Sequence, residues 1–225
     1  MIGRRGFLGG SAALAAAPAR AQGQPVACAL VLAVDVSGSV TPDRFALQRQ
    51  GYVRALLHPG IARRIEQSPF GAIAVLYLEW AGQAQQRVIV PWRRLSSRAS
   101  LAGFATALAD APRPFDGMTA IGAALDFATA AFDLCPFLAP RRVIDISGDG
   151  VNNDGPGAPD ARDRAVARNV VVNGLPIDPD QRSPDQVANH YRQQVIGGEN
   201  AFVMPVDGYE TAAFGLMAKL SREIA

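Results

Sequence analysis

Short runs of apolar residues alternate along the chain with segments in which apolar residues recur at helical spacing. The run at 29–34 is uninterrupted, which is typical of a parallel strand buried on both faces. Thr41 and Pro42 then form an N-cap and first-turn pair that predicts the start of a helix. The pattern as a whole predicts strands at 29–34, 72–80, 87–92, 142–146, 170–175 and 201–206, and helices at 42–57, 101–111, 121–134, 158–168, 186–195 and 212–224.

The alternation of strands and helices indicates an α/β fold of the Rossmann-like kind, a doubly wound, mostly parallel sheet with helices on both faces. The strand at 87–92 follows its predecessor after a short turn and contains Pro91, which is tolerated at a sheet edge. We therefore expect one antiparallel edge strand. Residues 177–184 are rich in proline and charge and predict a surface loop. Residues 22–225, without repeat or linker, are predicted to form a single domain.

The first 21 residues have the three parts of an export signal, namely Arg4 and Arg5, an apolar stretch at 7–17, and an A-x-A cleavage site at 19–21. The apolar stretch is shorter than the ~20 residues that span a bilayer. Residues 1–21 therefore predict a signal peptide that is removed, with no stable membrane anchor. The segment around the two arginines resembles a twin-arginine export signal, and a general secretory signal is the alternative. Both predict a periplasmic or secreted protein.

Charge narrows the range of partners. The chain has 22 Lys and Arg against 20 Asp and Glu, a net charge of +2. Arg4, Arg5 and Arg20 lie in the predicted signal, so the mature chain is close to neutral. A near-neutral domain lacks the basic surface that binds nucleic acid or anionic lipid, and we expect neither as a partner.

The chain has two cysteines, Cys28 and Cys135. Export takes a protein into an oxidising compartment, where paired cysteines form disulfides. A Cys28–Cys135 disulfide is predicted if the strands at 29–34 and 142–146 are neighbours, because both thiols then lie at one end of the sheet. The alternative is two small apolar side chains that do not meet.

Oxygen-bearing side chains gather where predicted strands and loops end. Asp35, Ser37 and Ser39 follow the first strand, Thr119 opens the helix at 121–134, and Asp149 follows the strand at 142–146. In open α/β sheets, ligands bind at the carboxyl ends of the strands. Two carboxylates and three hydroxyls, without His or Cys, suit a hard divalent cation such as Mg²⁺ or Mn²⁺, with Ca²⁺ as a further candidate. Neutral hydroxyl ligands leave such a cation able to bind an acidic group of a partner.

These residues resemble the metal-ion-dependent adhesion site of von Willebrand factor A domains, because they occur in the order D-x-S-x-S, then a Thr before a helix, then an Asp at a strand exit. The segments VLAVDVSGSV, TAIGAALDFA and RRVIDISGDGVNN are also similar to a family of exported bacterial proteins of unknown function built on that fold. The resemblance implies that the hydroxyls of Ser37, Ser39 and Thr119 contact the cation, while Asp35 and Asp149 bind it directly or through water. It further implies a non-enzymatic module whose partner is a protein with an exposed Asp or Glu.

An enzyme is the alternative function. The D-V-S-G-S segment at 35–39 and the G-D-G-V-N-N segment at 148–153 are similar to two motifs of haloacid-dehalogenase-like, Mg-dependent phosphatases and phosphotransferases. In that family Asp35 would be the nucleophile and Asp149 a Mg²⁺ ligand. Such enzymes also need a lysine between the two motifs. The single lysine of this chain, Lys219, lies beyond both.

Other polar residues near these motifs are expected to have structural roles. Residues 152–154 are predicted either to orient Asp149 or to form a polar turn. Asp145, inside a predicted strand, is expected to pair with Arg141 or Arg142 and is given no metal role.

The predicted leader can be tested with a reporter protein that is active only when it is exported already folded. Fused to it, residues 1–25 should direct export, and changing both Arg4→Lys and Arg5→Lys should stop it because the twin-arginine route depends on that pair. Reporter activity in the periplasmic fraction is the measurement. Export that survives the double change would assign the leader to the general secretory route.

Overall fold

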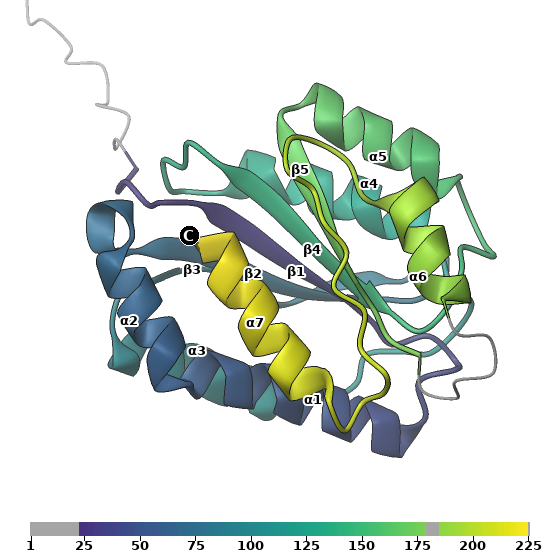
Figure 1. Ribbon diagram of the computed structural model, residues 1–225, viewed down its shortest axis with the longest axis horizontal. Coiled ribbons are helices and arrows are strands. Elements are labelled where there is room, and N and C mark those ends of the chain that lie inside the picture. Colours follow the sequence, from purple (N-terminus) through teal and green to yellow (C-terminus); the bar gives the residue numbers. More distant parts are fainter. Residues whose placement is uncertain (1–22, 179–184, 225) are drawn as a thin grey trace, which may run out of the picture.

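Five strands form one sheet in the computed structural model, which describes residues 23–178 and 185–224 (Figure 1). The predicted leader lies outside these residues. The order across the sheet is β3-β2-β1-β4-β5, and only β3 runs antiparallel to its neighbour. The predicted doubly wound, mostly parallel sheet with one antiparallel edge strand is therefore confirmed. The strands are β1 (Ala29–Asp35), β2 (Ile73–Trp80), β3 (Gln86–Leu95), β4 (Arg142–Gly148) and β5 (Val170–Pro176).

The register of β1 determines which loops meet. Asp35 pairs with Trp80 of β2, and Val34 pairs with Ser147 of β4. The carboxyl ends of β1 and β4 therefore lie next to each other at one edge of the sheet. Every residue of β1 is buried, because the strand is central and covered on both faces.

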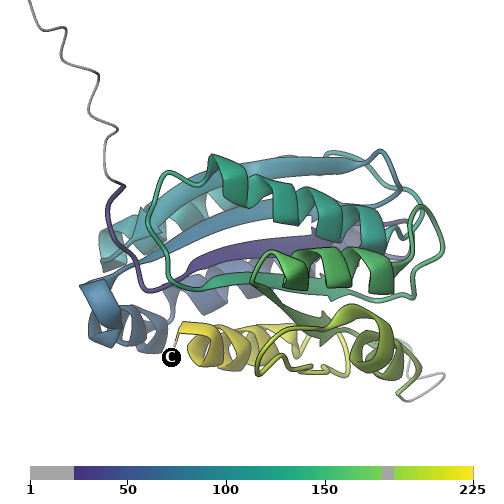
Figure 2. The same ribbon diagram turned by 90° about the horizontal axis from the view of Figure 1, so that it is seen from above.

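Two layers of helices cover the sheet (Figure 2). Leu30 and Leu32 of β1 pack against the first layer, and Val31 packs against the second, as the alternation of side chains along a strand requires. Among the described residues, no helix has both the length and the apolar character needed to cross a membrane. The first layer holds α1 (Pro42–Leu57), α2 (Pro59–Gln67), α3 (Arg98–Ala109) and α7 (Ala212–Ile224), the second holds α4 (Ile121–Ala131) and α5 (Ala158–Ala167), and α6 (Gln186–His190) lies near β5.

The strand predicted at 201–206 is wrong. This segment lies beside β5 but makes isolated bridges, one between Gly174 and Val203 and one between Ile177 and Val206. The Met204 and Val206 amides donate to the Gly174 and Pro176 carbonyls, but Pro176 has no amide hydrogen to donate back to the Met204 carbonyl, so the ladder is interrupted there.

Two helical segments also differ from the prediction. The helix predicted at 186–195 is α6 followed by a π-helical turn over Tyr191–Val195. The helix α2 was not predicted, because it is short and directly follows α1. It begins after His58, whose Nδ1 accepts a hydrogen bond from the Gly60 amide at 3.1 Å.

Cys28 and Cys135 do not form the disulfide. Both are free thiols, although β1 and β4 are neighbours as the prediction required. Cys28 packs in the core under the first helix layer, whereas Cys135 packs against the core under the second, so the sheet separates them. Burial raises the pKa of Cys28 to about 12, which leaves it a protonated core side chain.

A buried charge cluster lies between β4 and α7. The predicted pairing of Asp145 with Arg141 or Arg142 is wrong, because Lys219 is its partner. Its Oδ1 lies 2.7 Å from Nζ of Lys219, and the same Nζ lies 2.5 Å from Oε1 of Glu223. All three side chains are fully buried, because Asp145 faces the first helix layer, where α7 presents Lys219 and Glu223 one turn apart. Burial, and then the charge of Glu223, raise the pKa of Asp145 to about 7 against the opposing effect of Lys219.

Replacing Asp145 by Asn should flatten the pH dependence of stability. The folded chain keeps the Asp145 proton up to a pH of about 7, whereas an unfolded chain releases it near a pH of about 4. Between these values the folded state binds more protons, so this group's contribution to the free energy of unfolding falls as pH rises, by at most about 1.4 kcal/mol per pH unit. Urea unfolding of parent and variant across this window measures the two slopes.

The matched control is Asp133→Asn, which removes a carboxylate on the surface whose side chain is 62% exposed. This control should keep the parental slope, because water already solvates the group. Equal slopes for the parent and Asp145→Asn would contradict the prediction.

Candidate metal centre

The loop that follows β1 carries three of the predicted site residues. Asp35 and Ser37 are fully buried, and Ser39 is exposed. The Ser37 amide donates a hydrogen bond to Asp35 Oδ1 at 2.7 Å, and the hydroxyl oxygens of Ser37 and Ser39 lie 3.2 Å apart. The turn therefore holds a carboxylate and two hydroxyls in one cluster.

Asp149 reaches this cluster from the end of β4. Its Oδ1 accepts a hydrogen bond from the Ser39 hydroxyl at 2.5 Å. Its Oδ2 accepts one from the Tyr209 hydroxyl at 3.0 Å, and Nη1 of Arg44 lies 3.9 Å from the same oxygen. The loops after β1 and β4 are thus joined, and Arg44 and Tyr209, which the sequence did not identify, contact the second carboxylate.

Thr119 lies at the same edge of the sheet. The Gly38 amide donates to the Gly117 carbonyl at 2.8 Å, which joins the loop before α4 to the loop after β1. Thr119 faces the Asp149 loop as well, because a Cβ added at Gly150 would lie 3.6 Å from Thr119 Oγ1. The structure therefore brings all five predicted residues into three adjacent loops.

The residues after Asp149 hold Thr119. The Thr119 amide donates to Asn153 Oδ1 at 2.8 Å, and the Asn153 amide donates back to the Thr119 carbonyl at 2.9 Å. Asn152 Oδ1 accepts a hydrogen bond from the Gly122 amide in the first turn of α4 at 3.1 Å. These asparagines thus bridge the second and third loops. The hydrogen bonds of Asn152 and Asn153 therefore go to Thr119 and to the start of α4, and not to Asp149 as one of the two predicted roles required.

Long side chains fix the first loop from behind. Nε2 of Gln48, on α1, donates to the Asp35 carbonyl at 2.8 Å. Nη2 of Arg113, before α4, donates to the carbonyls of Val36 and Ser37 at 2.7 and 3.1 Å. These contacts within the protein fix the backbone of the loop, which preorganises its hydroxyls for a ligand.

Tyr191 is a further residue that the sequence did not identify. It is fully buried, and its hydroxyl has no hydrogen-bond partner among residues 23–178 and 185–224. A Cβ added at Gly148 would lie 2.8 Å from this hydroxyl and 2.7 Å from Asp35 Oδ2. The glycine therefore leaves room for both groups behind the site. Nothing in the local sequence distinguishes Tyr191 from an ordinary core aromatic residue.

The electrostatics of the site centre on Asp35. Within the part of the chain that the structure describes, its Oδ2 is buried without a hydrogen-bond partner. Burial, and then the negative charge of Asp149, raise the pKa of Asp35 to about 7. A buried carboxylate without a counter-charge is costly. A cation between Asp35 and Asp149 would provide that counter-charge.

The donor set fits a hard divalent cation. Carboxylate and hydroxyl oxygens are the ligands that Mg²⁺, Mn²⁺ and Ca²⁺ prefer. The residues that the structure describes contain no group of three or more His, Cys, Asp or Glu that could hold a metal. The hydroxyls of Ser37, Ser39 and Thr119 are therefore needed to complete the five-oxygen set.

Two comparisons concern the sequence. The profile of a family described as "Protein of unknown function (DUF1194)" matches residues 25–225. No curated protein matches the chain.

Solved structures share the fold. The chain is similar to proximal thread matrix protein 1 from the mussel byssus, with a TM-score of 0.64, 15% identity, and coverage of 91% of this chain and 49% of that one. It is also similar to the pilus adhesin SpaC from Lactobacillus rhamnosus GG, with a TM-score of 0.63, 16% identity, and coverage of 89% of this chain and 30% of that one. A third similar structure is a von Willebrand factor type A protein from Catenulispora acidiphila, with a TM-score of 0.56, 18% identity, and coverage of 88% of this chain and 43% of that one. The chain therefore has the von Willebrand factor A fold, and it spans less than half of each of those chains.

Replacing Asn153 by Ala should loosen the loop that carries Thr119. The Thr119 amide would lose its acceptor, and because Thr119 is only 6% exposed, water would not replace it. Leaving a buried amide unpaired costs about 1–3 kcal/mol of folding free energy. Its hydrogen exchange should therefore become about tenfold faster or more. Exchange of backbone amides measured by NMR checks this.

Asn152→Ala is the matched control, because Asn152 holds the Gly122 amide and not the Thr119 amide. It should speed exchange at Gly122 and spare Thr119. The same exchange pattern in both variants would show that the two asparagines do not hold separate loops.

Proposed function

We propose that this chain, which belongs through residues 25–225 to the family described as "Protein of unknown function (DUF1194)", is a metal-dependent protein-binding module. The site, together with the fold, carries this proposal. A divalent cation bound by Asp35, Ser37, Ser39, Thr119 and Asp149 would accept an acidic group of a partner protein. The predicted leader makes this module an exported one, in the periplasm or outside the cell.

One observation carries the proposal. Three loops that are distant in sequence bring two carboxylates and three hydroxyls to one edge of the sheet. There, Asp35 Oδ2 is buried without a partner among the described residues. A helix cap or a polar turn would account for each of these residues alone. Neither accounts for an unpartnered buried carboxylate oxygen beside a second carboxylate.

The chemistry of the set also favours binding. Two carboxylates neutralise a dication, and neutral hydroxyls leave it electrophilic enough to attract a further carboxylate. The bound cation would supply that attraction, while Gln48, Arg113 and Asn153 keep the three loops in place. A structure of proximal thread matrix protein 1, which shares this fold, has a zinc-occupied site of the metal-ion-dependent adhesion type, and this supports the binding of a divalent cation.

The enzyme alternative has less support. A phosphorylated nucleophile must be reached by its substrate, and Asp35 is fully buried with Oδ1 engaged by the Ser37 amide. Lys219, the single lysine, is buried and bound to Asp145 and Glu223, so it does not neutralise a phosphoryl group beside Asp35. The three similar proteins are named as a thread matrix protein, an adhesin and a von Willebrand factor type A protein, and none as an enzyme.

Variants of the five predicted ligands should rank by charge. Asp35→Asn and Asp149→Asn should abolish Mg²⁺ binding, because each removes half of the neutralising charge. Ser39→Ala and Thr119→Val should weaken it by about tenfold, or ~1.4 kcal/mol, because each removes one neutral oxygen. Titration calorimetry with magnesium chloride measures the affinities, and circular dichroism confirms that each variant folds.

Ser147→Ala is the matched serine control. Ser147 lies two residues before Asp149, but its hydroxyl contacts the Tyr52 hydroxyl, 3.0 Å away, and is not one of the five predicted ligands. Its loss should therefore leave Mg²⁺ binding unchanged. Unaltered binding in Thr119→Val would break the three-loop site. Incubation with acetyl phosphate followed by mass spectrometry tests the alternative, since a phosphorylated Asp35 would make the protein an enzyme.

The partner can be sought by capture from periplasmic extract. The parent protein should retain an acidic partner in Mg²⁺ and release it in chelator, and Asp149→Asn should retain nothing. A partner held equally by parent and variant in chelator would contradict a metal-bridged contact.

A further inference from the structure

A buried tyrosine lies behind the metal centre. Tyr191 opens the π-helical turn Tyr191–Val195, and its side chain is fully buried in the core under the second helix layer. Within residues 23–178 and 185–224, its hydroxyl has no hydrogen-bond partner. A buried hydroxyl without a partner destabilises the folded chain, and phenylalanine would fill the same space without that cost. Packing alone therefore does not explain why this residue is a tyrosine.

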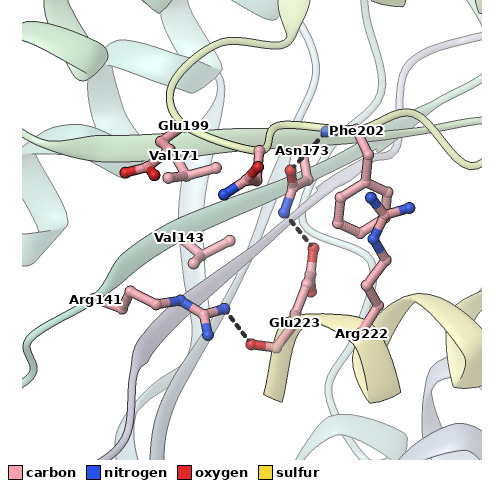
Figure 3. A pocket seen from close by; sticks show the side chains of 9 residues that line it. Arg141, Val143, Val171, Asn173, Glu199, Phe202, Arg222 and Glu223 are labelled. Carbon is pink, nitrogen blue, oxygen red and sulfur yellow. Dashed lines mark hydrogen bonds between the residues drawn. The ribbon is translucent and has the colours of Figure 1, made fainter. Parts of the chain in front are cut away.

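Two glycines make room for this side chain. A Cβ added at Gly174 of β5 would lie 2.6 Å from Tyr191 Cδ1, and one added at Gly148 of β4 would lie 2.8 Å from the hydroxyl oxygen. Side chains alternate along β5. Asn173 points to α7, where it donates to Glu223 (Figure 3), so the next residue faces the opposite layer, which holds Tyr191. The two strands therefore fix the position of the ring and of its hydroxyl.

The hydroxyl lies next to a carboxylate oxygen of Asp35. That oxygen, Oδ2, is 2.7 Å from the Cβ position at Gly148, the same point that is 2.8 Å from the Tyr191 hydroxyl. Asp35 lies on the same face of β1 as Val31, which packs under the second helix layer, so the carboxylate and the ring are on one side of the sheet. Oδ1 accepts a hydrogen bond from the Ser37 amide, whereas Oδ2 has no partner in the described part of the chain. A donor without an acceptor therefore lies beside an acceptor without a donor.

We propose that Tyr191 is a positioning residue of the metal centre, whose hydroxyl donates to Asp35 Oδ2 when a divalent cation is bound. The inference rests on the proposed function, because it concerns the same site. With the Ser37 amide on Oδ1 and the Tyr191 hydroxyl on Oδ2, both oxygens of the carboxylate would be held and its plane fixed. An ionised carboxylate has about four lone-pair sites, so each oxygen can still contact the cation.

A neutral donor suits this position. A lysine or arginine there would neutralise Asp35 itself and so compete with the cation. A hydroxyl stabilises the ionised carboxylate but leaves its charge for the cation. Asp149 has a comparable contact, because the Tyr209 hydroxyl donates to its Oδ2 at 3.0 Å. A tyrosine would then orient each of the two carboxylates in the site.

The segment that carries Tyr191 is also joined to the site. Nε2 of His190, the preceding residue, accepts a hydrogen bond from the Asn152 amide at 3.2 Å. Asn152 belongs to the loop after β4 that carries Asp149. Two adjacent residues thus lie against different parts of the site, His190 at the loop after β4 and Tyr191 behind the loop after β1. This contact keeps the hydroxyl in place relative to both carboxylates.

Tyr191→Phe tests the proposal, with Tyr77→Phe as the matched control. The Tyr77 hydroxyl is also buried without a partner among the described residues, but its side chain packs under the first helix layer, on the other side of the sheet from the Asp35 carboxylate. Tyr191→Phe should weaken Mg²⁺ binding by about tenfold, because a hydrogen bond to a charged carboxylate is lost. Tyr77→Phe should leave it unchanged. Titration calorimetry with magnesium chloride measures the three affinities.

Urea unfolding in chelator separates a positioning role from a packing role. Without the cation, Tyr191→Phe should unfold at the same urea concentration as the parent or at a higher one, because the variant no longer buries an unpartnered hydroxyl. A midpoint well below that of the parent would assign the hydroxyl to the stability of the core and overturn the proposal.

The tyrosine signals give a direct readout. The chain has four tyrosines, so ¹³C labelling at Cζ gives four NMR signals, and each Tyr→Phe variant assigns one signal by its absence. When Mg²⁺ is added to the parent, the Tyr191 signal should shift and the Tyr77 signal should not. If the parent binds Mg²⁺, an unmoved Tyr191 signal or an equal affinity in Tyr191→Phe would overturn the inference and leave the proposed function intact. A parent that does not bind Mg²⁺ would overturn both.

Discussion

The parallel pairing of β1 with β4 is the constraint on which the rest of the site depends. Because both strands run in the same direction and in register from Ala29 and Arg142, they end together, and the loops that carry Asp35 and Asp149 leave the sheet as neighbours. A buried parallel strand needs apolar residues on both faces, so chemistry is confined to the residues just beyond its end. The five predicted ligands therefore lie at this edge without disturbing the core.

This arrangement sets like charges close together in a poorly hydrated place. At the carboxyl edge, Asp35 and Asp149 lie near each other, and Asp35 Oδ2 has no partner, which is the condition a divalent cation relieves. Between β4 and α7, two other buried carboxylates, Asp145 and Glu223, share Lys219. In the first pair, Arg44 lies 3.9 Å from Asp149, and the proposed cation would supply the charge that Asp35 needs. In the second pair, Lys219 contacts both carboxylates.

The helix α7 takes part at both ends of the sheet. Tyr209, just before it, donates to Asp149, while Lys219 and Glu223 on its later turns complete the buried charge cluster with Asp145. An amphipathic helix is often described by its apolar face alone. Here two polar residues of the helix, Lys219 and Glu223, are buried as well, and they determine which charges Asp145 meets in the core.

The sequence by itself determined the fold class, the edge strand and the five oxygen-bearing residues, because these follow from local periods and from residue types at strand ends. It did not identify Arg44, Tyr209 or Tyr191 at the site, since Ser39 and Tyr209 contact Asp149 across 110 and 60 residues and no local pattern records such contacts. It predicted that Cys28 and Cys135 share one end of the sheet but not that they lie on opposite faces. The partner of Asp145 was likewise decided only by tertiary packing, which brings α7 against β4 and so fixes which buried charges meet.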